Sequence, residues 1–351
     1  TMATSFSAFP FTVRVNGRGV AMAGISTVGT RPEYRRQGLV RKIMTRAFAE
    51  QRERGQSIAG LWASQAAIYQ RYGFAPAGAL REYRVDTTDI RLLMDSDDLP
   101  VQRFEGVEAF EAVRALYKDF IAQRTGYLHR SKSLWLNNVF APPVEDGPVY
   151  VALVGSVSAP TGYVVYTLRA QRVQHRARAQ EIRIRDLAWL DRSAYAALWQ
   201  YLARHDLVGR VVWSTAPMDD PAPDLFIEPR LLHAQDLEGT WWRLVDVPAA
   251  LAQRGYDTEG VLVLGIAEDD LAPWNVGNWR IEYSREGAAV QTTRAPADVN
   301  LSVRALSSLY SGYSVARHLA NAQLITADDA ALAQFDRMMR TRFAPHCPDH
   351  Y

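Results

Sequence analysis

A short segment rich in arginine and centred on one glycine is the part of this sequence best suited to bind an anion. It consists of Arg35, Arg36, Gln37, Gly38, Leu39 and Val40, with Arg41 directly after it. If a helix begins at this glycine, its first backbone N–H groups lack partners within the helix, and the helix dipole places partial positive charge there. The segment therefore suits a diphosphate. Taken by itself, it fits an ordinary solvated helix start equally well.

The flanking residues favour the anion-binding interpretation. Residues 21–30 are mostly small or β-branched, which indicates a strand. After the glycine, Leu39, Ile43, Ala47 and Phe48 follow helical spacing, with charged residues between them. The sequence therefore predicts a strand that leads through a glycine turn into a helix.

A second motif follows the predicted helix. Residues 57–62 indicate another strand, and a short helix begins at Ser64 and contains Tyr69. Gly73 would end this helix as a C-cap, with Phe74 directly after it.

This order of elements resembles the GNAT acetyltransferase superfamily, in which an Arg/Gln-x-x-Gly-x-Gly/Ala loop holds the pyrophosphate of acetyl-CoA. Val40 departs from the small residue that usually ends that loop. With this departure, and with the second motif at residues 63–74, the chain is similar to the Eis (enhanced intracellular survival) group of bacterial N-acetyltransferases. The resemblance continues to the C-terminus and covers nearly the whole chain.

The resemblance implies that acetyl-CoA is the co-substrate and that two segments bind it. The backbone of Val28, Gly29 and Thr30 would splay from the neighbouring strand and polarise the thioester carbonyl, whereas plain pairing within the sheet is the alternative. Ser64 would hydrogen-bond the cofactor or cap its own helix. The predicted cofactor-binding residues are Val28, Gly29, Thr30, Arg35, Arg36, Gln37, Gly38, Leu39, Val40, Arg41 and Ser64.

Tyr69 is the candidate general acid. Acetyl transfer to an amine ends with a departing thiolate that needs a proton. A phenol with a pKa of about 10 is close enough to a thiol of about 8.5 to hand its proton over. The alternative is that Tyr69 is an ordinary amphipathic packing residue.

Tyr351 is the candidate general base, because in the Eis group the C-terminal carboxylate of the chain enters the active site. Burial would raise the pKa of that carboxylate and make it a better proton acceptor, although most chain ends fray in solvent. Asp236 and Glu238 are candidates for binding an amine-rich substrate, with ordinary surface positions as the alternative. His350 stands where the group often has an acid.

The composition excludes several other classes of protein. The net charge of +2 does not argue for a nucleic-acid or membrane partner. The one cysteine, Cys347, cannot form an internal disulfide, and no apolar run reaches the roughly 18 residues of a membrane span, so we expect a cytoplasmic protein. No metal is expected, because His346, Cys347 and His350 are the nearest approach to a ligand pattern.

The fold class expected is α+β, with two GNAT-like mixed-sheet α/β domains followed by a sterol-carrier-like α+β domain. We place these domains at residues 1–92, 93–244 and 245–351, with a strand at residues 80–85 closing the first. A complete GNAT domain has a strand, two helices and another strand before the strand predicted at residues 9–15. We therefore expect the N-terminal part of the first domain to be absent from this sequence.

The second domain repeats the order of strand, turn and helix at residues 180–204, but its turn contains no glycine. Asp191 or Ser193 would cap the helix instead, so this copy has kept the architecture and lost the cofactor. A basic run at residues 169–178 lacks interleaved aromatic residues, which favours a solvated hairpin over a nucleic-acid site.

We therefore expect an acetyl-CoA-dependent N-acetyltransferase that works by direct transfer in a ternary complex. The resemblance implies primary amines of aminoglycosides or other small polyamines as acceptors, and a homo-hexamer. Two alternatives stay open. One is a GNAT enzyme acting on protein lysines or peptide N-termini, and the other is a non-enzymatic lipid-binding protein with a long apolar tunnel in residues 245–351.

Overall fold

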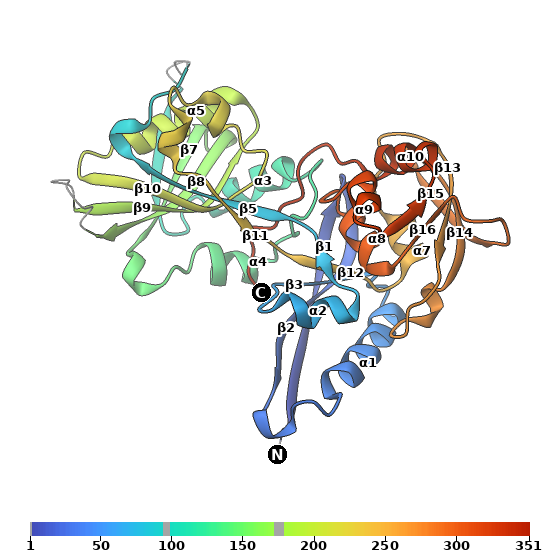
Figure 1. Cartoon of the computed structure of the whole chain (residues 1–351). Coiled ribbons are helices and arrows are strands. Elements are labelled where there is room, and N and C mark those ends of the chain that lie inside the picture. Colours follow the sequence, from blue (N-terminus) through green and yellow to red (C-terminus); the bar gives the residue numbers. More distant parts are fainter. Residues whose placement is uncertain (1, 94–98, 172–178) are drawn as a thin grey trace. The chain divides into compact units, whose positions relative to one another are not determined.

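The computed structural model describes residues 2–93, 99–171 and 179–351, which form two compact units (Figure 1). Unit 1 consists of Thr1–Ala79, Gln123–His129 and Glu238–Tyr351, and unit 2 of Leu80–Ala122 and Arg130–Leu237. Most of the predicted basic hairpin lies outside the described residues.

The first sheet of unit 1 has the strand order β1-β2-β3-β12-β4. Its strands are β1 (Thr4–Val15), β2 (Arg18–Thr30), β3 (Ile58–Leu61), β4 (Ala75–Pro76) and β12 (Trp241–Leu244). β1 and β2 form a long hairpin whose turn residues, Asn16 and Gly17, both have positive φ. β2 pairs with β3 in parallel, whereas β12 is antiparallel to both β3 and β4.

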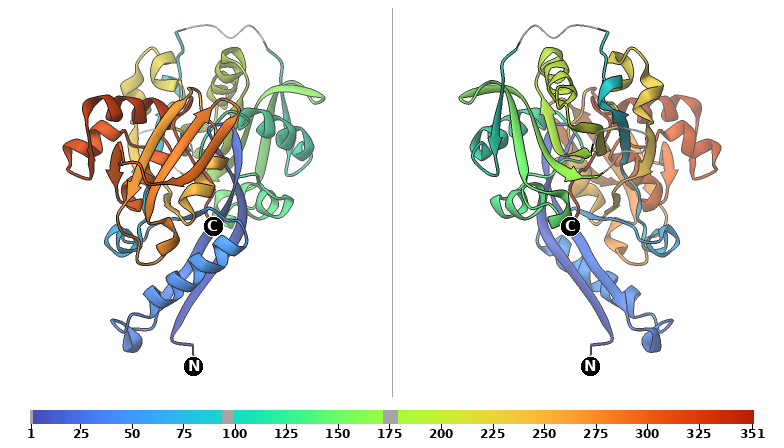
Figure 2. Two further views of the ribbon diagram at one scale, coloured as in Figure 1. Left: turned by 90° about the vertical axis from the view of Figure 1, so that its right-hand side faces the viewer. Right: turned by 90° about the vertical axis from the view of Figure 1, so that its left-hand side faces the viewer.

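Helix α1 (Leu39–Glu53) lies alongside the β1–β2 hairpin (Figures 1 and 2). Its buried side chains include Met44, Ala47 and Phe48, whose spacing of three and four residues places them on one face. Met44 and Phe48 pack in the cluster that also contains Tyr69 and Phe74. This packing connects the start of α1 to the second motif.

The remaining part of unit 1 is the sterol-carrier-like sheet, with strand order β15-β14-β13-β16-β17 (Figure 2, left). Its strands are β13 (Gly260–Ile266), β14 (Gly277–Ser284), β15 (Gly287–Thr293), β16 (Val299–Leu301) and β17 (Ile325–Ala327). The helical segments of unit 1 are η1 (Pro32–Tyr34), α1 (Leu39–Glu53), α2 (Ala66–Tyr69), η2 (Gln70–Tyr72), α7 (Val247–Gln253), η7 (Pro273–Asn275), α8 (Val303–Tyr310), α9 (Ala316–Asn321) and α10 (Asp329–Met339).

Unit 2 is built on a sheet of order β11-β5-β10-β9-β8-β7-β6. The strands are β5 (Ala79–Asp86), β6 (Val101–Glu105), β7 (Val149–Ser156), β8 (Ala159–Ala170), β9 (Gln180–Trp189), β10 (Val208–Ala216) and β11 (Gln235–Glu238). The helical segments are η3 (Thr87–Asp89), α3 (Phe110–Phe120), α4 (Lys132–Leu134), η4 (Trp135–Val139), η5 (Val144–Asp146), α5 (Arg192–Ala203), α6 (Ala222–Leu225) and η6 (Pro229–Leu232).

Two strands belong to different sheets from those that sequence order suggests. The strand expected to close the first domain is β5, and it pairs with β10 in unit 2. β12, from the predicted second domain, instead lies between β3 and β4 in the first sheet. All four residues of β12 are buried, which suits a central strand, but such a pattern specifies burial and not the strand's partners.

The turn before α5 confirms the expectation of a side-chain cap. The carboxylate of Asp191 accepts a hydrogen bond of 2.7 Å from the backbone N–H of Ala194. A carboxylate at the N-cap occupies the position that an anionic ligand would take at a helix start.

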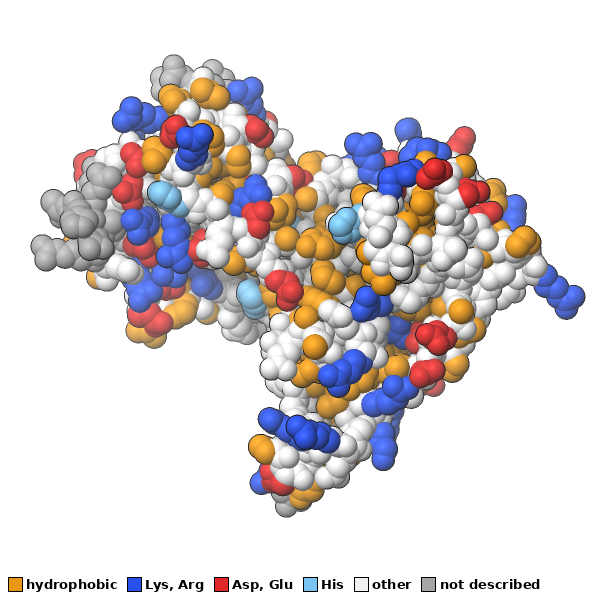
Figure 3. Space-filling view, in the orientation of Figure 1, with side chains coloured by type: hydrophobic (Ala, Val, Ile, Leu, Met, Phe, Trp, Pro, Cys, Tyr) orange, Lys and Arg blue, Asp and Glu red, His pale blue; other side chains and the backbone are white. Residues whose placement is uncertain are grey.

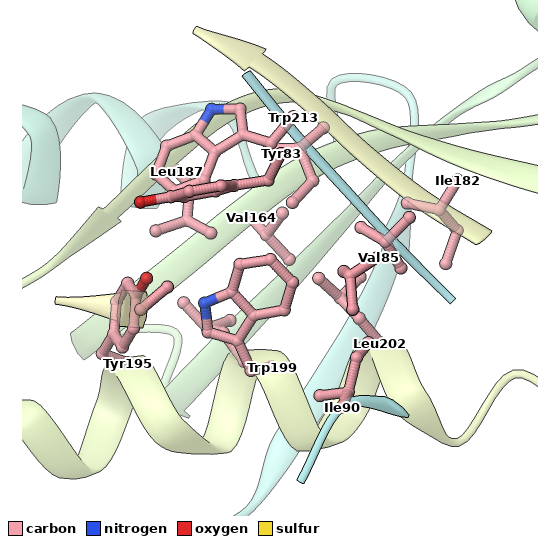
Figure 4. Close-up of a cluster of buried hydrophobic side chains, with 14 of the residues drawn as sticks. Tyr83, Val85, Ile90, Val164, Ile182, Leu187, Tyr195, Trp199, Leu202 and Trp213 are labelled. Atoms are coloured by element: carbon pink, nitrogen blue, oxygen red, sulfur yellow. The ribbon is translucent and has the colours of Figure 1, made fainter. Parts of the chain in front are cut away.

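The core of unit 2 surrounds a buried carboxyl, Asp220. The hydroxyl of Tyr195 donates to it at 2.7 Å, and the N–H of Ala222 donates at 3.0 Å. Figure 4 shows Tyr195 and Trp199, both on α5, facing Tyr83 and Trp213 in this core. Burial raises the pKa of Asp220 from its ordinary 3.8 to about 7.

Because of this buried carboxyl, we expect unit 2 to lose stability as the pH rises. Because the pKa is higher in the folded than in the unfolded state, the stabilisation is complete below about pH 4 and is lost as the pH passes about 7. A difference of about three pKa units corresponds to roughly 4 kcal/mol in the free energy of unfolding. Urea unfolding at pH 5 and pH 8 measures the part of this loss above pH 5, about two pKa units or roughly 3 kcal/mol. Asp220→Asn should flatten this pH dependence, whereas the same change at exposed Asp224 should leave it in place.

No helix within the described ranges is long and apolar enough to span a bilayer.

Candidate active site

The predicted cofactor segments line one cleft of about 610 Å³ in unit 1. The cleft lies where the end of β2, the start of α1 and the helix α2 meet. Its lining residues are Val28, Gly29, Thr30, Tyr34, Arg35, Arg36, Gly38, Leu39, Val40, Ser64, Gln65, Ile68, Tyr69, Arg71 and Tyr72. Nine of the eleven predicted cofactor-binding residues line the cleft, as does Tyr69, whereas Gln37 and Arg41 do not.

The start of α1 has the geometry expected of an anion site. Gly38 is the N-cap, with φ of 73°, and no side chain of the described residues caps the helix. A Cβ at Gly38 would meet no atom within 4 Å, so the left-handed backbone rather than crowding requires glycine here. The uncapped N–H groups of the first turn are therefore open to a ligand.

The arginines beside this helix start differ in what they bind. Arg36 is exposed, has a φ of 63° and makes no ion pair within the described part of the chain. Arg35 donates to the carbonyl oxygen of Thr30 at 3.1 Å. Arg41 instead pairs with Asp270 at 2.9 Å and lines a different cavity. Figure 3 shows basic side chains gathered around the lower end of unit 1, where η1 leads into α1.

Strand β2 leaves its neighbour before it reaches the cleft. The parallel pairing of β2 with β3 covers Met22–Gly24 and Ile58–Gly60, and in the described residues it extends no further. On the opposite edge, the register with β1 shifts next to Thr27, whose φ is 50°. A bulge of this kind re-aims the backbone beside a site. It places Val28, Gly29 and Thr30 in the cleft lining.

Tyr69 ends helix α2 and lies at the boundary between the core and the cleft. Its side chain packs edge-on against Phe74, with ring centroids 6.0 Å apart, and only 7% of the residue is exposed. Tyr69 also lines the cleft, so it is both a packing residue and a cleft residue. Within the described part of the chain, its hydroxyl makes no hydrogen bond.

The end of the chain packs on the sheet that carries β2 and β3. The indole N–H of Trp62 donates to the carbonyl oxygen of Asp349 at 3.0 Å, and its ring stacks on His350 at 3.9 Å. The ring of Tyr351 lies 5.0 Å from that of Phe11. In Figure 1 the C-terminus lies beside β3 and α2. Trp62 is two residues before the cleft residue Ser64.

The two acidic residues proposed for substrate binding do not line this cleft. The carboxylate of Asp236 accepts two hydrogen bonds from Arg81, at 2.6 and 3.1 Å. Glu238 lines another cavity of unit 1, together with Trp241 and His318. Their role in binding an amine stays a prediction.

Sequence reasoning missed Tyr34, Gln65, Ile68, Arg71 and Tyr72, which also line the cleft. Helical spacing from Ser64 could have indicated Ile68, Arg71 and Tyr72, because residues four, seven and eight positions apart share a helix face. No comparable signal marks Tyr34, which the turn at η1 brings to the cleft.

Arg36 provides the first test of this cleft. Arg36→Ala should raise the KM for acetyl-CoA by about tenfold, with kcat changed little, because a charge-assisted contact with an exposed phosphate would be lost. The effect should diminish at high salt. Arg46→Ala is the matched control, since Arg46 lies on α1, pairs with Glu50 and does not line the cleft. Equal KM values for the two variants would contradict the phosphate assignment.

Within residues 2–93, 99–171 and 179–351, no three His, Cys, Asp or Glu side chains are arranged to hold a metal ion.

The domains of the chain match known families in the predicted order. Residues 1–77 and 126–247 match two models described as an acetyltransferase (GNAT) domain, and residues 247–348 match a sterol carrier protein domain. The predicted fold class is thereby confirmed. GNAT domains use acetyl-CoA as the co-substrate, so these two matches also support the predicted co-substrate.

Relatives of similar length support the same assignment. An uncharacterised N-acetyltransferase of Streptomyces coelicolor is 30% identical over 87% of this chain and 75% of its own length. The N-acetyltransferase Eis of Mycobacterium tuberculosis is 29% identical over 93% of this chain and 79% of its own. The crystal structure of Eis1 from Mycobacterium abscessus has a TM-score of 0.86 and 27% identity, covering 100% of this chain and 88% of that one.

These relatives are named acetyltransferases, so the alternative of a non-enzymatic lipid-binding protein is wrong.

In the sterol-carrier-like domain, α8 packs against β12, where Ser307 accepts a hydrogen bond from the backbone N–H of Leu244. The cleft, its uncapped helix start and the relatives agree, and the chain belongs to the Eis group of GNAT-superfamily N-acetyltransferases.

Proposed function

We propose that this enzyme transfers the acetyl group of acetyl-CoA directly to a primary amine of an aminoglycoside-like molecule or another small polyamine. The observation that carries the proposal is that one cleft contains both the uncapped start of α1 and Tyr69. Such a cleft suits a diphosphate at one end and a reacting thioester near the phenol.

Each demand of the reaction has a candidate group. The backbone at Val28, where β2 has left β3, would polarise the thioester carbonyl. Tyr69 would protonate the thiolate as the carbon–sulfur bond breaks. In a chain that ends at Tyr351, the terminal carboxylate would take the proton that the ammonium acceptor must lose before or during attack. The ammonium group loses two protons as it becomes an amide. The carboxylate takes the first and releases it to solvent, and the second replaces the proton that Tyr69 gives to coenzyme A.

An acetylation assay tests the acceptor class. Kanamycin-like amines and a lysine-containing peptide should be compared at equal amine concentration, with the products identified by mass. We expect acetylation of the small polyamine and little of the peptide. Preference for the peptide would instead support a GNAT enzyme that acts on protein lysines or N-termini.

Initial-rate kinetics test the order of events. Direct transfer in a ternary complex predicts double-reciprocal lines that intersect when both substrates are varied. Parallel lines would indicate a covalent acetyl-enzyme and contradict direct transfer. The homo-hexamer also stays a prediction, for which light scattering coupled to size-exclusion chromatography is the measurement.

A further inference from the structure

Two glycines on adjacent strands lie directly beside the last residue of the chain. Gly24 on β2 and Gly60 on β3 are register partners in the parallel pairing. A Cβ at Gly24 would lie 2.9 Å from Cε2 of Tyr351, and a Cβ at Gly60 would lie 2.9 Å from its hydroxyl oxygen. The two glycines thus form the surface on which this ring rests.

Backbone conformation does not explain these two glycines. Neither has a positive φ, so any residue could adopt its backbone. What a side chain at Gly60 would lack is space, because its Cβ would also meet Sδ of Met22 at 2.9 Å and Cδ1 of Trp242 at 3.3 Å. At Gly24 the ring of Phe11 is a further obstacle. Glycine at both positions leaves a slot of aromatic shape in the sheet.

The ring fills this slot without using its hydroxyl. The hydroxyl oxygen of Tyr351 is buried and has no hydrogen-bond partner in the described residues. Burial raises the pKa of this phenol well above its ordinary value, so it stays neutral. Tyr351 as a whole is half-buried, so the atoms that solvent reaches are atoms other than its hydroxyl oxygen. The ring therefore anchors the last residue in the slot.

Trp62 contacts the two residues that precede Tyr351 in the chain. It follows β3 directly, donates to the carbonyl oxygen of Asp349 and stacks on His350. Asp349 and His350 are thus held by a hydrogen bond and by ring stacking, both from Trp62, which lies between β3 and the cleft residue Ser64.

We propose that Gly24, Gly60 and Trp62 are positioning residues that fix the terminal carboxylate. The two glycines do so by holding the ring of Tyr351, and Trp62 by holding Asp349 and His350. This inference rests on the proposed function, in which that carboxylate accepts the proton of the amine. None of the three residues needs to touch substrate. Their effect passes through the ring and the tail.

Gly60→Ala is the central test, because its added methyl group would meet the hydroxyl of Tyr351. We expect kcat at neutral pH to fall by about ten- to a hundredfold, since displacement of a reacting group by about 1 Å has effects of this size. The KM for acetyl-CoA should stay unchanged. Gly19→Ala is the matched control on β2, because its Cβ would meet only the methyl group of Thr12 at 3.2 Å and His129 at 3.9 Å or more.

The pH profile separates positioning from general damage. With the base displaced, the amine must lose its proton to water. The loss of kcat in Gly60→Ala should then be largest below the pKa of the acceptor amine and should shrink as the pH rises. A loss that is uniform across pH would contradict the inference.

A second substitution removes the obstacle itself. In the Tyr351→Phe background the hydroxyl is gone, so Gly60→Ala should lower kcat much less than it does with Tyr351 present. An undiminished effect would assign the cost to Met22 or Trp242 and overturn the inference.

Carboxypeptidase digestion provides a readout that does not depend on activity. In the chain ending at Tyr351, release of this residue should be faster from Gly60→Ala than from the wild type or Gly19→Ala. Equal release from all three proteins would overturn the slot. If the wild type transfers no acetyl group while release still differs, then the proposed function fails and the slot stands.

Discussion

Replacing Tyr69 by phenylalanine should lower kcat by about a hundredfold or more, with little change in the affinity for acetyl-CoA. The hydroxyl is the only group removed, and loss of a positioned general acid typically has this size of effect. The ring would keep its edge-on contact with Phe74 and its place in the core cluster. Steady-state kinetics measure the first quantity, and calorimetric titration with coenzyme A measures the second.

Tyr72→Phe is the comparison for this variant. Tyr72 lines the same cleft three residues later, so the change removes a hydroxyl of the same chemistry from the same surface. We expect kcat to change far less than in Tyr69→Phe. Equal losses in the two variants would contradict a specific acid role for Tyr69. A loss of coenzyme A affinity in Tyr69→Phe would indicate a binding role.

Extending the chain beyond Tyr351 should nearly abolish acetyl transfer. Two added glycines would convert the terminal carboxylate into a neutral amide, which cannot accept the proton of the ammonium group. Loss of a general base corresponds to a fall of about a hundredfold or more in kcat. Because the ring of Tyr351 would remain available for its contact with Phe11, the fold should be unchanged.

Two measurements keep this test interpretable. The extended protein should bind coenzyme A as tightly as the unextended chain, and it should unfold at the same temperature. Full activity in the extended protein would remove the assignment of the base. Loss of activity together with loss of coenzyme A binding would show that the extension disturbs the cleft instead.

The local elements of the first domain could be predicted because their signals are short in range. Helix α1 begins directly after Gly38, since helical spacing and a residue tolerant of positive φ mark that boundary within a few positions. Similarly, α2 with Tyr69 and the turn at Gly73 follow from adjacent residues. The cleft then follows, because both helices are connected to strands of one sheet.

Sheet membership could not be predicted, as β5 and β12 show. A buried strand records which of its faces are covered, and many partners satisfy that requirement equally. Arg41 shows the same limit for a side chain. Its position in the motif suggested a phosphate contact, but its partner, Asp270, is 229 positions away.

The amino-acid sequence by itself determined the glycine turn before α1, the tyrosine motif and the order of three domains, because propensity, capping and periodicity act between neighbouring residues. Only the tertiary structure decided which strands share a sheet, where Arg41 and Asp236 find their partners, and that two ordinary strand glycines flank the ring of Tyr351. Those outcomes depend on contacts between residues far apart in the chain, and close packing selects them only when the whole unit has folded.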